Sequence, residues 1–297
     1  MNTLTTLDRY IERLSAGDRL TADEIRELAA TPDILALGMI ADAARRRLHD
    51  ARVTFVRVAE SPYDTAFADG APALARELRL TGAPNDLATA TDAIGAARSV
   101  AGDRTLAGFS WADVERWSQG ARPPQVLAAL KSAGLDAVAG LPLDEMSDPP
   151  GAIEALAGTG FQRLRLSIAK APAADRVRLL LLAGQLQDAH GCILSINPLP
   201  MALGAFRPTT GDEDVKMVAI ARLAAPAVPS IQVDWRRYGP KLAQVALTFG
   251  ADDIDGVSAS EEAPEGRRRA PLEEIRRNII AAGFAPTERD GRFAALG

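Results

Sequence analysis

The chain has 297 residues, of which 47% are hydrophobic and 25% are charged, a composition typical of globular proteins. A net charge of -5 excludes a nucleic-acid binder that relies on bulk positive charge. The single cysteine and the two histidines exclude an internal disulfide and any metal site built from several such residues.

The first 50 residues are predicted to be helical. Residues 21–24 have the pattern of a capping box, with Thr21 as the N-cap and Glu24 three residues later. Pro32 is predicted to open a second helical stretch. Helical spacing there predicts a stripe of apolar residues: Leu35, Met39, Ala43 and Leu48. We expect an N-terminal helical extension over residues 1–50, followed by one barrel domain over residues 51–297.

From Val53 onward, short β-rich segments alternate with helical ones, which is typical of parallel strands joined by crossover helices. About eight strands are predicted, which favours a closed (β/α)8 barrel of the TIM type over an open sheet. The expected strands are Val53–Val58, Glu77–Thr81, Thr105–Phe109, Leu135–Ala139, Arg163–Ile168, Ile193–Ile196, Ile231–Trp235 and Asp252–Asp255. The expected helices are Leu87–Val100, Pro123–Ala133, Ala173–His190, Gly211–Ala225, Pro240–Phe249 and Pro271–Ala282. A proline- and glycine-rich stretch at residues 147–151 is predicted to be a loop.

Barrel enzymes bind and react at the carboxyl ends of their strands. In this sequence those ends are polar but show no catalytic constellation, so no catalytic residue is assigned and we do not expect radical chemistry. Taken individually, each polar residue at these strand ends is also explained as an ordinary loop or helix-cap residue without a role in ligand binding. The candidate ligand-binding residues are Lys170, Ser195, Asn197, Asp234 and Arg236.

No apolar stretch approaches the ~20 residues that a membrane-spanning helix requires. The first ten residues include Asp8 and Arg9 and have no apolar segment, unlike a signal peptide. We therefore expect a cytosolic protein.

The second half of the chain carries a recognisable signature. It consists of residues 208–223, beginning with Pro208-Thr209-Thr210-Gly211-Asp212, and residues 239–256, beginning with Gly239-Pro240-Lys241-Leu242. In order and spacing these segments resemble the radical-SAM enzymes of the futalosine route to menaquinone, of the aminofutalosine synthase and cyclic dehypoxanthine futalosine synthase type. The deazaflavin-cofactor synthases are similar but more distant. The resemblance implies a radical-SAM-like barrel.

The resemblance also implies three cysteines in the pattern C-x3-C-x2-C after the first strand, which would hold a [4Fe–4S] cluster that chelates S-adenosylmethionine. Here the corresponding segment, Ala59–Phe67, contains no cysteine, and it is short. Cys192 lies far along the chain and is explained as a small buried hydrophobic residue. We therefore expect no cluster, no metal and no other cofactor.

Three hypotheses follow. The first is a cluster-free relative of the menaquinone enzymes that acts as a non-catalytic partner or scaffold, either with a radical-SAM homologue or as a homodimer. The second is a cluster-independent enzyme or binding protein for a nucleoside-like metabolite at the barrel mouth. The third is an active radical-SAM enzyme whose cluster comes from another chain. An open barrel mouth would favour ligand binding, whereas a filled one would favour a structural role.

Overall fold

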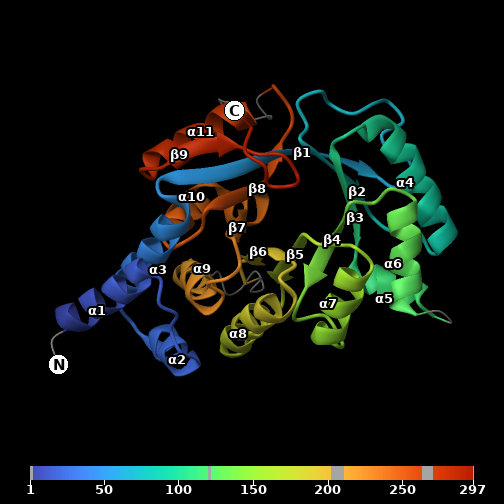
Figure 1. Cartoon of the computed structure of the whole chain (residues 1–297). Coiled ribbons are helices and arrows are strands. Elements are labelled where there is room, and N and C mark those ends of the chain that lie inside the picture. Colours follow the sequence, from blue (N-terminus) through green and yellow to red (C-terminus); the bar gives the residue numbers. More distant parts are fainter. Residues whose placement is uncertain (1–2, 120–121, 202–210, 263–269, 297) are drawn as a thin grey trace, which may run out of the picture.

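The computed structural model describes residues 3–119, 122–201, 211–262 and 270–296, with the side chains of the first helix described from Leu7 onward. Within these ranges, parallel strands β1 to β8 form a closed barrel, because β1 pairs with both β8 and β2 (Figure 1). The strands are β1 Arg52–Pro62, β2 Glu77–Thr81, β3 Thr105–Ser110, β4 Ala137–Pro142, β5 Leu164–Ile168, β6 Ile193–Pro198, β7 Ser230–Asp234 and β8 Asp253–Ser258.

Helices cover the outside of the barrel, so residues on both faces of the strands are buried. The helices are α1 Thr3–Ala16, α2 Ala22–Ala30, α3 Ile34–His49, α4 Leu87–Ala101, α5 Trp111–Trp117, α6 Pro123–Ser132, α7 Pro149–Gly158, α8 Ala173–His190, α9 Asp212–Ala224, α10 Trp235–Leu247 and α11 Pro271–Ala281. Among the described residues, no helix is both long and apolar enough to span a membrane.

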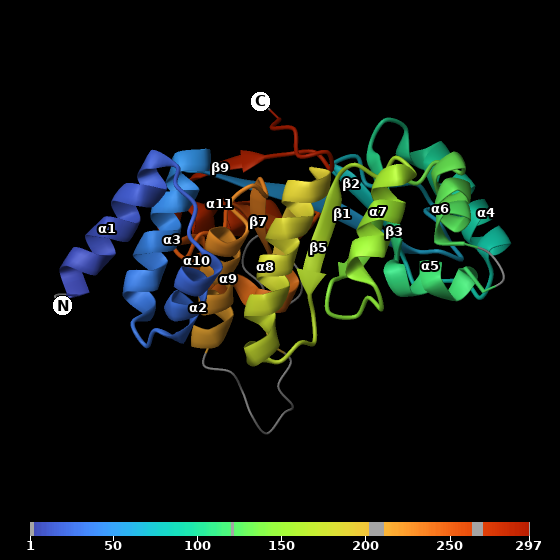
Figure 2. The same cartoon turned by 60° about the horizontal axis from the view of Figure 1, so that its bottom comes forward.

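A ninth strand, β9 (Ala285–Glu288), lies beside the first half of β1. β1 is 11 residues long, so it pairs with β9 along Arg52–Phe55 and with β2 along Val58–Pro62, on the edge opposite β8. In Figure 2, β9 and the C-terminus lie at the top, whereas the arrow of β5 points downward. The C-terminal segment therefore lies at the amino-terminal end of the barrel, away from the strand ends where barrel enzymes bind substrates.

The N-terminal helices form an additional layer on one side of the barrel. α1 packs on α3, and α2 and α3 pack on α9 (Figure 1). As a result α9 lies between the barrel and this layer, and residues 214–223 are all buried. The capping box predicted at Thr21 is confirmed, since its hydroxyl accepts from the amide of Glu24 and the Glu24 carboxylate accepts from the amide of Thr21. The boundary at residue 50 stays a prediction.

The predicted barrel is confirmed, but some predicted elements are wrong in detail. The stretch at residues 147–151 is not simply a loop, because Asp148 caps α7, which begins at Pro149. α5 and β9 were not expected, since each is too short to show a clear periodicity. α10 begins at Trp235 and not at Pro240, because a break at Gly239, with a φ of 71°, separates a first turn from the helix that was predicted. Residues 208–210 of the signature lie outside the described residues.

The apolar stripe predicted on α3 does not coincide with the buried face of that helix. Leu35 and Met39 are 72% and 55% exposed, and Leu48 is exposed as well. The buried face of α3 instead consists of Leu37, Gly38, Ile40, Ala41 and Arg45. Both sets have helical spacing, so periodicity alone could not choose between them.

The contact between α8 and α9 depends on a glycine. A β-carbon at Gly184 would lie 2.5 Å from the carbonyl oxygen of Ala224, whereas one at Gly95, in the exposed face of α4, would meet nothing within 4 Å. We expect Gly184→Ala to lower the free energy of unfolding by about 1–3 kcal/mol through overpacking. Gly95→Ala should raise it by about 0.5–1 kcal/mol. Urea denaturation of both variants measures the difference, and equal effects would mean that α8 and α9 are farther apart than described.

Candidate functional site

Two of the five candidate residues lie inside the barrel, and two others lie at its rim. Ser195 and Asn197 are buried on β6, two residues apart and hence on one face of the strand. Asp234 ends β7, and Arg236 lies in the first turn of α10. Lys170 follows β5 and is exposed, and its ammonium group contacts a Glu145 carboxylate oxygen at 2.8 Å. The five residues therefore do not form one site.

Asp234 and Arg236, two of the candidate ligand-binding residues, do not pair with each other. The Asp234 carboxylate accepts hydrogen bonds from the backbone amides of Arg236 and Arg237 at 2.8 and 3.0 Å, so it acts as the N-cap of α10. The guanidinium group of Arg236 instead donates to Glu60 at 2.7 Å and to the carbonyl of Gly256 at 3.2 Å. Burial raises the pKa of Asp234 above its ordinary value.

The interior of the barrel holds a charged cluster that the sequence analysis missed. Arg79 of β2 donates to both carboxylate oxygens of Asp255 on β8, at 2.6 and 3.0 Å, and to Glu77 at 2.6 Å. Arg165 of β5 donates to both oxygens of Glu77, at 2.7 and 2.8 Å. β2 and β5 are not neighbours in the sheet, so the Arg165–Glu77 pair crosses the interior. We call these four residues the lumen cluster.

The pKa values of the two carboxyl groups show how strongly the lumen cluster is coupled. Burial alone would raise the pKa of Glu77, but the guanidinium groups of Arg165 and Arg79 outweigh burial and lower it. The same competition, with Arg79 as the main opposing charge, holds the pKa of Asp255 well below its usual range. Both groups are therefore carboxylates at neutral pH, and charge inside the barrel is compensated within the chain.

A second buried pair closes the amino-terminal end of the barrel. Arg289, directly after β9, donates to both carboxylate oxygens of Asp253 on β8 at 2.6 and 2.7 Å, and both side chains are fully buried. Thr54 and Gln232 donate to the same carboxylate at 2.6 and 2.7 Å. The Arg289 guanidinium also lies 3.5 Å from the ring centroid of Phe293. These contacts join the C-terminal segment to the barrel interior.

Four buried polar atoms near the lumen cluster have no hydrogen-bond partner among the described residues: Arg165 Nη2, Ser195 Oγ, Asn197 Oδ1 and Ser230 Oγ. Arg165, Ser195 and Ser230 are paired in register across β5, β6 and β7. Residues paired in register on parallel strands project to the same face. Since buried polar atoms are normally hydrogen-bonded, these positions point to bound water or a small polar ligand.

The segment after β1 does not provide the donors of an iron–sulfur cluster. It contains no cysteine. The segment turns back on itself, since the amide of Phe67 donates to Ser61 Oγ at 3.0 Å. The side chains of Ala66 and Phe67 are buried. A pocket of about 540 Å³ lies between this segment and β8, lined in part by Glu60, Asp69 and Ser258. The thiolates that a cluster requires are absent from this lining.

Cys192 does not substitute for the missing donors. Its thiol is buried directly before β6, and burial raises its pKa, so the thiol stays protonated at neutral pH. In the described part of the chain, no group of three or more histidine, cysteine, aspartate or glutamate side chains is arranged to hold a metal ion. The residues present therefore do not fit the cluster that the resemblance implies.

The fold is shared with solved enzyme structures. The FeFe-hydrogenase maturase HydG from Carboxydothermus hydrogenoformans aligns with a TM-score of 0.68 and 14% identity, covering 97% of this chain and 81% of that one. Methylornithine synthase (PylB) aligns with a TM-score of 0.67 and 13% identity, covering 93% of this chain and 97% of that one. At such low identity the likeness shows the fold alone, which the strand pairing defines as a closed (β/α)8 barrel.

Sequence similarity places the chain more narrowly. Residues 199–296 match the CofH/MqnC C-terminal region. The chain is 38% identical over 134 residues to a 5-amino-6-(D-ribitylamino)uracil–L-tyrosine 4-hydroxyphenyl transferase of Archaeoglobus fulgidus, covering 41% of this chain and 39% of that protein. It is 29% identical over 238 residues to an aminodeoxyfutalosine synthase of Thermus thermophilus, covering 61% and 58%.

These matches span less than two thirds of the relatives' own length. Within the class of (β/α)8 barrels, the chain is similar to the CofH/MqnC group over its C-terminal third and to the aminodeoxyfutalosine synthases, and the resemblance stated from the sequence is confirmed.

Proposed function

We propose that the chain acts in the cytosol as a cluster-free, non-catalytic partner or scaffold subunit for a radical-SAM enzyme of menaquinone biosynthesis. One observation carries the proposal: the carboxylates of the lumen cluster are occupied by guanidinium groups of the same chain. Charged groups that are paired with each other inside the barrel are not free to bind a charged substrate there. Here the charges of the lumen cluster stabilise the barrel itself.

Two further observations support this role. The segment between β1 and β2 contains no cysteine, and the chain has only Cys192. The relatives include aminodeoxyfutalosine synthases, and from that resemblance we infer the pathway. A barrel keeps its packing after its chemistry is lost, because core and site residues are largely separate sets.

Co-purification from the native cell tests the proposal. We expect the tagged chain to elute with a cysteine-bearing radical-SAM homologue, identified by mass spectrometry, and deletion of its gene to lower the menaquinone content. A chain that elutes alone as a monomer, together with an unchanged menaquinone content after deletion, would refute the partner role. If the chain elutes as a homodimer without the homologue, only a role as a homodimeric scaffold remains. A lower menaquinone content after deletion would then support that role, and an unchanged content would refute it.

Iron binding provides an independent test. After anaerobic reconstitution with iron and sulfide, we expect no stoichiometric iron and no charge-transfer absorption in the visible region. The cysteine-bearing homologue, treated in parallel, serves as the positive control. A stoichiometric cluster in this chain would overturn the cluster-free assignment.

The unpartnered atoms of Arg165, Ser195, Asn197 and Ser230 favour a second candidate, a binding protein for a nucleoside-like metabolite. Equilibrium dialysis with adenosine as the probe tests it. If this candidate holds, Asn197→Ala loses binding because a buried acceptor is removed, whereas Lys170→Ala, at an exposed position, binds as the wild type does. Equal binding by both variants, or none by the wild type, rules out a site at Asn197.

A further inference from the structure

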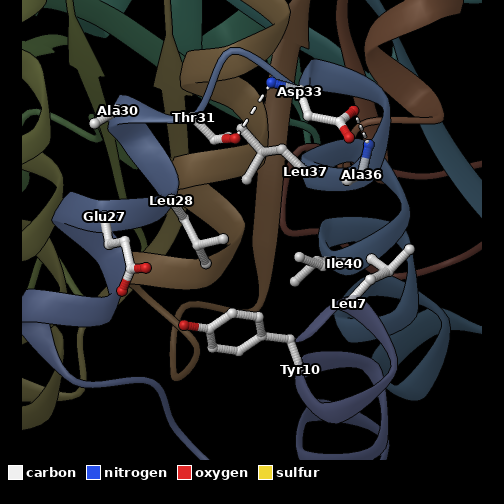
Figure 3. Close-up of a pocket in the computed structure, with 10 residues that line it drawn as sticks. All are labelled: Leu7, Tyr10, Glu27, Leu28, Ala30, Thr31, Asp33, Ala36, Leu37 and Ile40. Carbon is white, nitrogen blue, oxygen red and sulfur yellow. Dashed lines mark hydrogen bonds between the residues drawn. The ribbon is translucent and has the colours of Figure 1, made fainter. Parts of the chain in front are cut away.

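A pocket of about 350 Å³ lies between α1, α2 and α3, outside the barrel (Figure 3). Ligand pockets in proteins are typically about 300–1,000 Å³ and mostly apolar. Apolar side chains from all three helices line this one, and three polar residues complete the lining. The apolar residues are Leu7, Tyr10, Leu28, Ala30, Ala36, Leu37 and Ile40, and the polar ones are Glu27, Thr31 and Asp33.

Hydrogen bonds hold the corner between α2 and α3 that forms one wall of the pocket. Asp33 caps α3 by accepting from the amide of Ala36 at 3.0 Å, and its own amide donates to Thr31 Oγ1 at 3.2 Å. The ammonium group of Lys216 on α9 donates to the carbonyl of Thr31 at 2.9 Å. Because α9 is buried against the barrel, this bond fixes the corner to the core, and the pocket is formed before any ligand arrives.

A tyrosine hydroxyl in this pocket has no partner. The Tyr10 residue as a whole is only 3% exposed, but its hydroxyl oxygen is accessible and makes no hydrogen bond with any described residue. Figure 3 shows its ring extending from α1 across the pocket toward Leu28 and Glu27 of α2. The hydroxyl oxygen is reached from the pocket, so it is free to bind a polar group that is supplied from outside the chain.

The charged residues of the pocket have one sign. Glu27 and Asp33 carry carboxyl groups, and among the described residues no lysine, arginine or histidine lines the pocket. Neither carboxylate forms an ion pair with a described residue, although Asp33 is engaged as a helix cap. Glu27 is therefore the carboxylate that is free to meet a cation, and it lies on the side of the pocket toward which the Tyr10 ring extends (Figure 3).

We infer that this pocket binds a small apolar amine. The apolar body of the ligand packs among Leu28, Leu37 and Ile40, and its ammonium group donates to the Tyr10 hydroxyl and is attracted by the Glu27 carboxylate. The site is independent of the barrel interior and of the partner role proposed above.

Three naphthyl probes of matched size test the inference by isothermal titration calorimetry: 1-naphthylmethylamine, 1-naphthalenemethanol and 1-naphthoic acid. We expect the amine to bind with a dissociation constant below about 1 mM, the alcohol to bind about fivefold more weakly, and the acid not to bind detectably. Absence of amine binding, or equal binding of the amine and the acid, overturns the inference.

Variants then locate the site. Ala36→Leu fills the pocket and should abolish binding of the amine and of the alcohol, while Ala88→Leu, at an exposed position of α4, should change neither. Circular dichroism confirms that each variant is folded. If Ala36→Leu is folded and binds the amine like the wild type, the amine binds elsewhere and the inference fails.

Two further variants test the head group. Glu27→Gln should weaken binding of the amine about fivefold and leave binding of the alcohol unchanged. Glu12 is an exposed residue of α1 outside the lining, so Glu12→Gln should change the binding of neither probe. Tyr10→Phe should weaken the binding of both probes about fivefold, because the amine and the alcohol each form a hydrogen bond with the phenol hydroxyl. A Glu27→Gln variant that keeps the full preference for the amine would exclude this carboxylate from the site.

Discussion

Replacing Glu77 by alanine should lower the free energy of unfolding by about 3–5 kcal/mol. The Glu77 side chain is fully buried and lies between two guanidinium groups, those of Arg79 and Arg165. Without it, two buried positive charges share only the carboxylate of Asp255. Guanidinium chloride denaturation, followed by circular dichroism, measures the change.

A rim carboxylate provides the matched control. Glu145→Ala removes the partner of Lys170, whose side chain is 77% exposed, and should change the free energy of unfolding by less than about 1 kcal/mol. Similar losses for both variants would show that the lumen cluster is much better hydrated than its burial indicates.

Because Arg79 and Arg165 lower the pKa of Glu77, the contribution of Glu77 to the stability of the fold depends on pH. The folded-state pKa of Glu77 is lowered from about 4.5, so its stabilisation is fully present above that pH and is lost as the pH falls through the lower folded-state value. The difference in stability between the wild type and Glu77→Gln should therefore be constant near neutral pH and shrink under acid conditions. A difference that grows as the pH falls would contradict the lowered pKa.

Removing the guanidinium group of Arg289 should be comparably damaging. Arg289→Ala leaves the fully buried carboxylate of Asp253 with only the neutral donors Thr54 and Gln232, and we expect a loss of about 3–5 kcal/mol in the free energy of unfolding. The contact with the Phe293 ring is lost as well. Because β9 is linked to the barrel interior through this residue, hydrogen exchange of the β9 amides should accelerate more than that of the β5 amides.

Arg292→Ala tests whether that loss is specific. Arg292 lies three residues later in the same segment, is exposed, and makes a single long contact to the carbonyl of Asp103. We expect a change within about 0.5 kcal/mol. If Arg292→Ala destabilised the chain as much as Arg289→Ala, the segment as a whole, and not the pair with Asp253, would be responsible.

Much of the fold could be predicted from the sequence because it depends on local patterns. The helix Ala173–His190 and the strand Glu77–Thr81 were predicted with the bounds that the structure has. The capping box at Thr21 was predicted because its two hydrogen bonds join residues only three positions apart. The alternation of strands and helices then predicted a closed barrel, and the cysteine content argued against a cluster.

The candidate site was predicted less well, for a physical reason. Ser195 and Asn197 are inside the barrel, but Asp234 caps a helix and Lys170 is exposed. The sequence analysis missed the lumen cluster. The available signal was the alternation of the charged Glu77 and Arg79 with leucines in a predicted strand. Two charges at alternate positions of a strand buried on both faces require partners across the interior.

The sequence by itself therefore determined the order of the elements and the barrel class, because these follow from local periodicity and composition. Only the tertiary structure decided that Arg165 reaches Glu77, that Arg289 reaches Asp253 and which face of α3 is buried. The two ion pairs join residues 88 and 36 positions apart, and the buried face of α3 depends on its packing against α9. Such contacts are set by the closure of the barrel and the packing of helices around it, and no local pattern records them.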